Sequence, residues 1–89
     1  MQVPRNIQFT RLIKVNGRLK EFNFRKRNRE DGPQYNVDVS DERNNRFMFT
    51  MVNTSLGWKI SPASLPGWIL DSEGGLHDAI LNEEETMYS

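Results

Sequence analysis

Cysteine is absent from this 89-residue chain, and histidine occurs once. Without thiols the sequence excludes disulfides, thiolate metal sites and cysteine nucleophiles. Small secreted domains usually depend on disulfides, so the absence of cysteine favours a cytoplasmic location. Long apolar runs are also lacking, since no segment approaches the roughly 18 apolar residues that a membrane span requires. We therefore expect a cytoplasmic protein without a membrane-spanning segment.

Net charge is lacking as well, because twelve cations balance twelve acids. The two signs are nevertheless segregated along the chain. Residues 1–30 hold nine cations and two acids, for a net charge of +7, whereas residues 31–89 hold three cations and ten acids, for −7. Such asymmetry indicates either a ligand surface of one sign or two halves of a domain that attract each other. The sequence leaves both interpretations open.

The dipeptide Asn16-Gly17 is the strongest local structural signal, because both central positions of a type I′ turn require positive φ. A two-residue turn at this point places Phe9 opposite Phe24. Alternation along the two strands then places Phe9, Phe22 and Phe24 on one face of the hairpin. We expect this face to belong to the core.

The remaining pattern predicts an antiparallel meander followed by a helix. Alternating apolar residues and turn residues indicate strands at about 7–15, 18–27, 34–40, 46–52 and 58–61. The apolar period then changes to about 3.6, which predicts a helix over about 65–82. Gly74-Gly75 weaken this helix, so we expect either one helix with a soft middle or two short helices that meet there. The predicted fold class is α+β, a curved sheet of four to five strands packed in two layers on a C-terminal helix.

Residues 1–82 are expected to form this single domain. The following run, Glu83-Glu84-Glu85, places acids at the C-terminus of the predicted helix, where the helix dipole disfavours negative charge. We therefore expect the helix to fray and residues 83–89 to form a mobile acidic tail.

The sheet face opposite the predicted core carries apolar residues that a purely solvated face would not normally keep. They are Leu12, Leu19, Met48 and Val52. We interpret them as an interface for a second copy or another protein partner, with the neighbouring charges as its rim. Scattered exposure of single apolar residues is the alternative explanation.

The segment 18–29 interleaves cations with Phe22 and Phe24, a composition typical of nucleic-acid surfaces. The register assigns both phenylalanines to the core, so the cations alone remain for a ligand. Those expected to point outward, or to lie in the following turn, are Lys14, Arg25, Arg27 and Arg29. A solvated or ion-paired surface, and a surface for an acidic protein partner, are the alternatives.

His77 and Glu73 lie four residues apart on one face of the predicted helix, a spacing that can hold a metal ion or tune a proton-transfer residue. Two ligands without a third make a poor metal site, and an exposed i, i+4 pair explains the spacing better. The sequence shows no catalytic triad and no glycine-rich phosphate loop beside them. We expect no metal, no cofactor, no small-molecule substrate and no enzymatic activity.

Two stretches carry a resemblance to a known fold class. Lys20-Glu21-Phe22-Asn23-Phe24 lies in a predicted strand, and Lys59-Ile60-Ser61 leads into the helix that contains Trp68. Over Arg18 to Ile80 the order of strands and closing helix resembles the Whirly and Pur-alpha class of single-stranded nucleic-acid-binding domains, with five strands in place of four. The resemblance implies a curved sheet backed by a helix, dimerisation, and binding of single-stranded DNA or RNA.

The sequence thus supports two hypotheses. The first is a small non-catalytic binding module that associates with a second copy, or with a protein partner, through Leu12, Leu19, Met48 and Val52. The second is a domain that binds single-stranded DNA or RNA through the basic face of its first hairpin.

Overall fold

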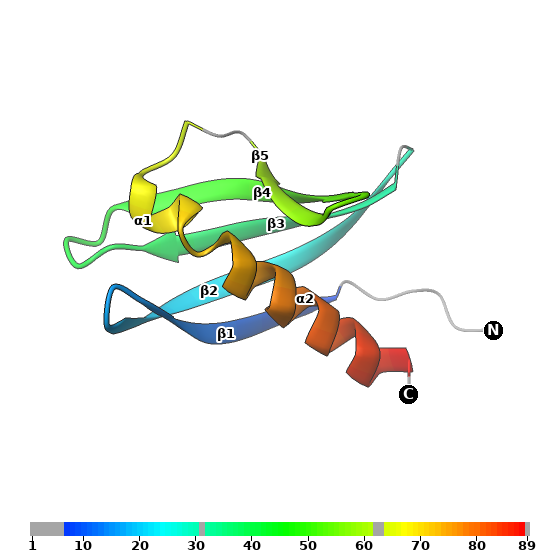
Figure 1. The fold of residues 1–89 in the computed structure, drawn as a ribbon, viewed down its shortest axis with the longest axis horizontal. Helices are drawn as coiled ribbons and strands as arrows, with labels where there is room; N and C mark the ends of the chain where they lie inside the picture. Colours follow the sequence, from blue (N-terminus) through cyan, green and yellow to red (C-terminus); the bar gives the residue numbers. More distant parts are fainter. Residues whose placement is uncertain (1–6, 31, 62–63, 89) are drawn as a thin grey trace.

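A computed structural model describes residues 7–30, 32–61 and 64–88. Arg5 and Asp31, which were counted among the charges, lie outside the described residues. One antiparallel sheet contains five strands in chain order: β1 Gln8–Val15, β2 Arg18–Arg29, β3 Gly32–Ser40, β4 Arg46–Thr54 and β5 Gly57–Ser61. Two helices follow, α1 Gly67–Leu70 and α2 Glu73–Tyr88. Figure 1 shows α2 lying across one face of the curled sheet, which confirms the predicted two-layer α+β fold.

The turn between β1 and β2 sets the register that the sequence predicts. Asn16 and Gly17 have φ angles of 52° and 80°, the positive values that a type I′ turn requires. Phe9 pairs with Phe24 across the hairpin, as expected. The phenylalanines therefore lie on the face that packs against α2. We call this face of the sheet the inner face and the opposite face the outer face.

β2 and β3 are longer than the strands expected at about 18–27 and 34–40, because β2 extends to Arg29 and β3 begins at Gly32. Asn28 pairs with Pro33, and Arg29 pairs with Gly32. Proline is accepted here because it stands near the start of a strand, where its missing N–H affects only the end of the ladder. Arg29 consequently lies at the end of β2 and not in a turn.

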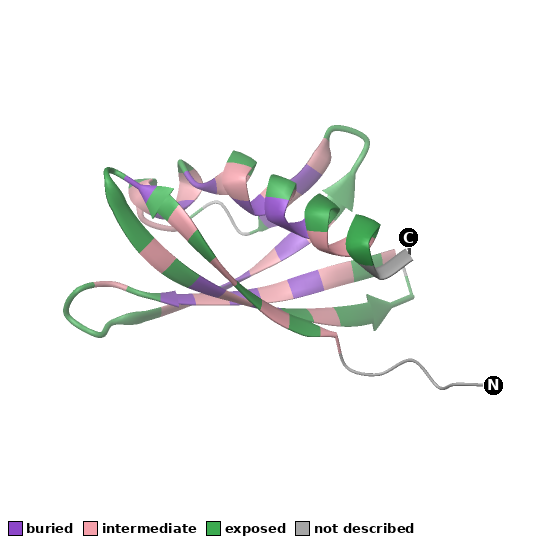
Figure 2. Ribbon diagram, turned by 90° about the horizontal axis from the view of Figure 1, so that it is seen from below, coloured by how far each residue is buried: buried purple, intermediate pink, exposed green. Residues whose placement is uncertain are grey.

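The core fills the space between the inner face and the helices, where Figure 2 shows most of the buried segments. Its largest fully buried side chains come from both layers: Tyr35, Phe22, Phe24, Met51, Ile69, Leu76, Ile80, Val37 and Val39. The ring of Phe9 stacks on that of Phe24 with centroids 4.5 Å apart, and Tyr35 meets Trp58 edge to face at 5.2 Å. Full burial of each large apolar side chain is worth about 1.5–3 kcal/mol, so this layer is the main source of stability.

The predicted helix over residues 65–82 is in fact two helices, and they meet before Gly74-Gly75. The hydroxyl of the buried Ser72 donates to the carbonyl of Ile69 over 2.5 Å, which satisfies an acceptor at the end of α1. α2 then starts at Glu73, so both glycines lie in its first turn. The backbone N–H groups of a first turn have no partner within the helix, and glycine there does not divide the helix.

α2 does not end at residue 82, the expected end of the domain, but continues to Tyr88. Residues 83–88, assigned by the sequence to an acidic tail, are its last turns. Glu83 lies 2.6 Å from the guanidinium of Arg11 on β1, and this contact offsets the unfavourable effect of the helix dipole on an acid near the helix C-terminus.

The next residue, Glu84, also binds the sheet. Its Oε2 accepts a hydrogen bond from the Tyr35 hydroxyl at 3.0 Å and lies 3.5 Å from Lys26 Nζ. Lys26 in turn lies over the Tyr35 ring, 5.9 Å from its centroid. Glu84 therefore connects α2 to β2 and β3.

Ion pairs join the basic first third of the chain to its acidic remainder. Among the described residues these pairs are Arg11–Glu83, Arg18–Glu42, Lys20–Glu42 and Lys26–Glu84. These four cations of the first hairpin therefore attract acids of α2 and of the turn between β3 and β4, as one interpretation of the segregated charge predicts.

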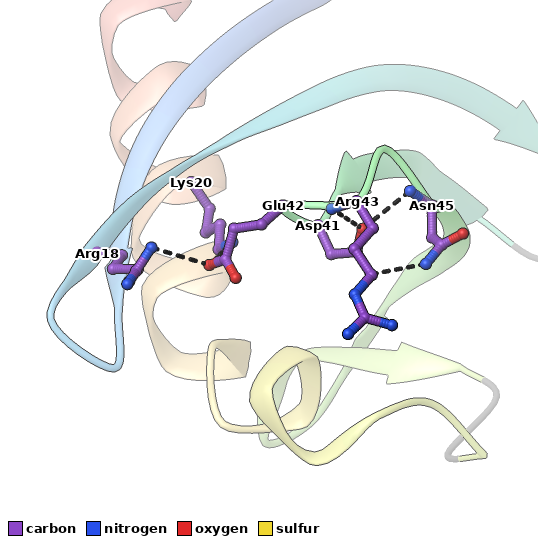
Figure 3. Close-up of polar contacts among 6 residues, drawn as sticks. All are labelled: Arg18, Lys20, Asp41, Glu42, Arg43 and Asn45. Carbon is purple, nitrogen blue, oxygen red and sulfur yellow. Dashed lines mark hydrogen bonds and ion pairs between the residues drawn. The ribbon is translucent and has the colours of Figure 1, made fainter.

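Glu42 connects the turn between β3 and β4 to the first hairpin, as Figure 3 shows. Its Oε1 lies 3.0 Å from Lys20 Nζ and 3.4 Å from Arg18 Nη1. The hydrogen bond from Lys20, together with the charges of Lys20 and Arg18, lowers the pKa of the Glu42 carboxyl.

Asp41 organises the same turn from within (Figure 3). Its Oδ1 accepts the backbone N–H groups of Arg43 at 2.8 Å and Asn45 at 2.9 Å. The hydrogen bonds from Asn45 hold the pKa of Asp41 below its ordinary value. A lowered pKa in the folded state means that this stabilisation is present while Asp41 is ionised and is lost as the pH falls through the folded pKa.

Replacement of Glu84 by glutamine is expected to lower the free energy of unfolding by about 0.5–1 kcal/mol, because the partly exposed ion pair with Lys26 is removed. Urea denaturation measures this change. Glu85→Gln is the matched control, since it removes the same charge from an exposed neighbour and is expected to cause no loss. Equal losses in the two variants would show that the total charge of α2 matters, and not the contacts of Glu84.

Candidate functional site

The outer face consists of the residues that alternate with the core, and the register arranges them in rows across the sheet. One row crosses all five strands and is polar throughout: Gln8, Arg25, Asn36, Thr50 and Ser61. The next row crosses four strands through Thr10, Asn23, Asp38 and Met48. The centre of the outer face is therefore mainly polar.

Side-chain hydrogen bonds run along the second row. The Thr10 hydroxyl donates to Asn23 Oδ1 over 2.8 Å, and Asn23 Nδ2 donates to Asp38 Oδ1 over 3.0 Å. Arg46 Nη2 lies 3.4 Å from the same oxygen of Asp38. These contacts position polar groups of β1, β2, β3 and β4 relative to one another, so this part of the surface is ordered before any ligand arrives.

An open groove of about 770 Å³ lies over these rows. Its polar side chains and its exposed apolar side chain are Gln8, Thr10, Asn23, Arg25, Asn36, Asp38, Arg46, Met48 and Thr50. Amide and hydroxyl groups offer both donors and acceptors to a ligand. The lining also includes Phe9, Phe24 and Phe49, whose side chains alternate onto the inner face. The described outer face therefore offers no exposed aromatic ring on which a ligand could stack.

The cations that the sequence assigned to nucleic-acid contact are all exposed: Lys14, Arg25, Arg27 and Arg29. Within the described part of the chain none of these four forms an ion pair with an acid. The three arginines alternate along β2, which places neighbours about 6.6 Å apart in one column of the outer face. Lys14 lies on β1 at the opposite end of that face.

The apolar residues that the sequence assigned to an interface lie on the outer face, but in two separate places. Leu12 on β1 and Leu19 on β2 are diagonal neighbours, and each residue is 62% exposed. Met48, which is 70% exposed, and the half-buried Val52 lie on β4. The polar residues of β2 and β3 lie between the two pairs.

Glu73 and His77 do not form the exposed pair that their spacing suggested. Both are half-buried, and both accept hydrogen bonds from the backbone of β5. The Trp58 N–H donates to His77 Nδ1 over 3.0 Å, and the Ile60 N–H donates to Glu73 Oε2 over 2.8 Å. Because β5 is the last strand of the sheet, these N–H groups would otherwise be unpaired on its edge.

The spacing of the two side chains matches the strand that they cap. Four helical residues rise about 6.0 Å, and two strand residues rise about 6.8 Å, so an i, i+4 pair can reach two successive outward N–H groups. Gly57 is also needed, because its φ is 107° and a Cβ there would lie 2.7 Å from His77 Cε1. Sequence reasoning missed this role, although the i, i+4 spacing on a helix that follows an edge strand was a usable signal.

Within residues 7–30, 32–61 and 64–88, no group of three His, Cys, Asp or Glu side chains is placed to hold a metal ion. Among the described residues, neither α1 nor α2 combines the length and the hydrophobicity of a membrane-spanning helix. Comparison with protein-family models, with curated proteins and with solved structures finds no match. The resemblance to the Whirly and Pur-alpha class stays a prediction.

Replacement of His77 by alanine is expected to lower the free energy of unfolding by about 1–3 kcal/mol, because the Trp58 N–H loses its acceptor. His77→Asn is the matched variant, since an asparagine Oδ1 can take the place of Nδ1 and should recover part of the loss. Denaturant unfolding gives the energies, and amide hydrogen exchange reports on Trp58 directly. Unchanged exchange at Trp58 in the alanine variant would exclude His77 as a cap for this edge.

Proposed function

We propose that this protein is a small non-catalytic binding module that associates with a second copy of itself through the outer face of its sheet. The observation that carries this proposal is the exposure of two neighbouring apolar residues on the first hairpin. Leu12 and Leu19 are each 62% exposed there. Complete burial of a leucine side chain is worth about 1.5–3 kcal/mol, so contact of a partner with both leucines would contribute favourably to the free energy of binding. The inner face is already packed against α2, which leaves the outer face for a partner (Figure 1).

His77 and Glu73, the two residues considered for proton transfer, have structural contacts that support a non-catalytic role. His77 Nδ1 and one carboxylate oxygen of Glu73 are engaged by backbone N–H groups of β5. The groove on the outer face is lined by other residues, and its lining includes no histidine among the described residues. We also propose a cytoplasmic location, since a domain without cysteine needs no oxidising compartment.

Sedimentation equilibrium over a range of concentrations tests the self-association. The native chain is expected to form a dimer, and a variant carrying Leu12→Lys and Leu19→Lys is expected to dissociate at least tenfold more readily, a change of about 1.4 kcal/mol. Leu56→Lys is the control, because Leu56 is 81% exposed and lies in the turn between β4 and β5. A monomer at the highest concentrations would contradict the proposal, as would an equal effect of the control.

Binding of single-stranded DNA or RNA is the second candidate function. Its support is the set of exposed cations without acid partners in the described chain: Lys14, Arg25, Arg27 and Arg29. Because the described aromatic side chains of the sheet lie on the inner face, affinity would come from phosphate contacts and from hydrogen bonds to the groove, without stacking. An acidic protein is the alternative ligand for the same cations.

Titration with a mixed-sequence oligonucleotide at several salt concentrations tests this second function. Affinity is expected to fall with salt with a log–log slope of about −0.7 for each phosphate neutralised. A variant carrying Arg25→Gln and Arg27→Gln should make the slope shallower by about 1.4, if each arginine contacts one phosphate. Arg43→Gln, in the turn between β3 and β4, is the control and should leave the slope unchanged. NMR amide shifts that do not move on addition of DNA or RNA at low salt would exclude this function.

A further inference from the structure

The two edges of the sheet differ in whether side chains bind their backbone N–H groups. On β5, Glu73 and His77 of α2 accept the N–H groups of Ile60 and Trp58. On β1, α2 contacts side chains of the inner face, through the Arg11–Glu83 ion pair and the close approach of Gly75 to Ile13. Among the described residues no side chain accepts an N–H group of its edge, and the edge carbonyl of Thr10 receives one long hydrogen bond of 3.5 Å from Arg11 Nη1. Figure 1 shows β1 as the outermost strand on the side of the sheet away from β5. An uncovered strand edge is a template for another strand.

The alternation of hydrogen-bonded and non-hydrogen-bonded pairs identifies the backbone groups of β1 that point away from β2. The Lys26 N–H donates to the Ile7 carbonyl over 2.9 Å, so this pair is a hydrogen-bonded one. Bonded and non-bonded pairs alternate along an antiparallel ladder, and the odd-numbered residues of β1 therefore bond to β2. The even-numbered residues direct their N–H and C=O groups toward the edge. They are Gln8, Thr10, Leu12 and Lys14.

We propose that β1 of one copy pairs antiparallel with β1 of a second copy about a two-fold axis, so that one sheet continues across the dimer. This inference rests on the proposed self-association and places the junction at the edge of β1, where Leu12 borders the outer face. Two-fold symmetry makes the interface self-complementary, because the same edge supplies both donors and acceptors. The free groups lie on even-numbered residues, so the pairing must join even-numbered residues to one another.

Charge and strand length select the register. Pairing centred on Arg11 would place that side chain opposite its own copy. Each Arg11 binds Glu83, so two such ion pairs would meet at one point of the junction, with their like charges opposite each other, which is destabilising. Pairing centred on Leu12 avoids this contact and joins residues 9–15 of the two copies. The paired segments would form about six backbone hydrogen bonds across the junction. Lys14 of each copy would then lie opposite the uncharged Thr10 of the other.

The register centred on Leu12 also brings the exposed leucines of the two outer faces together. Leu12 of one copy would lie opposite Leu12 of the other. Leu19 is a diagonal neighbour of Leu12 within each copy. Leu12 and Leu19 of one copy would therefore join Leu12 and Leu19 of the other in one apolar strip that crosses the junction.

Amide hydrogen exchange by NMR, measured in dilute and concentrated samples, tests the proposed edge pairing. The amides of Thr10, Leu12 and Lys14 are expected to exchange rapidly in dilute samples and at least tenfold more slowly in concentrated ones. The amides of Arg11 and Ile13 bond to β2 and are expected to be protected in both samples. A dimer in which Thr10, Leu12 and Lys14 stay unprotected would overturn the edge pairing and leave self-association in place. A monomer at every concentration would overturn both.

A charge on the proposed junction gives an independent test. Leu12→Lys would bring two ammonium groups face to face, and we expect the dissociation constant of the dimer to rise at least tenfold. Concentration-dependent protection of Thr10 should disappear in the same variant. Leu56→Lys adds the same charge at another exposed leucine and should preserve both properties. A dimer that tolerates Leu12→Lys would overturn the inference. Unchanged protection of the Arg11 and Ile13 amides, which bond to β2, would show that the variant still folds.

Discussion

The positive φ angles of Asn16 and Gly17 decide what each face of this sheet presents. They fix the pairing of β1 with β2, and a shift of one residue in that pairing would move every side chain of one strand to the other face. With the observed register, Phe22 and Phe24 lie on the inner face and are buried. The polar rows, the column of arginines and the exposed leucines of the outer face are the other consequence of the same turn.

The segregated charge of the chain has two roles in the folded protein. Arg11 and Lys26 bind acids of α2, so part of the basic character of the first hairpin holds the helix on the sheet. Arg25 and Arg27 alternate with these contacts along the hairpin and project from the outer face without acid partners in the described chain. The sheet thus divides the cations of the basic segment into two groups. One group binds acids of the same chain, and the other is exposed on the outer face.

Local signals were sufficient to predict the meander and the faces of its strands, because turn residues and alternation act over a few positions. Contacts between distant parts of the chain were not predictable in the same way. The extension of α2 past residue 82 depends on partners such as Arg11, which is 72 residues from Glu83. Gly75 seemed from the sequence to weaken the helix, yet a Cβ there would lie 3.1 Å from Ile13 Cγ2, so glycine permits close packing on β1. The roles of Glu73 and His77 likewise required knowledge of which strand forms the edge.

Nuclear Overhauser contacts between α-protons of β1 and β2 test the register most directly. In an antiparallel sheet the Cα atoms of non-hydrogen-bonded pairs lie about 4.5 Å apart, close enough for strong contacts between their α-protons. The observed turn predicts such contacts between Thr10 and Asn23 and between Leu12 and Glu21. A contact of Leu12 with Phe22 in their place would mean a register shifted by one residue, with phenylalanines on the outer face, and would contradict the assignment of the core and of the binding surface.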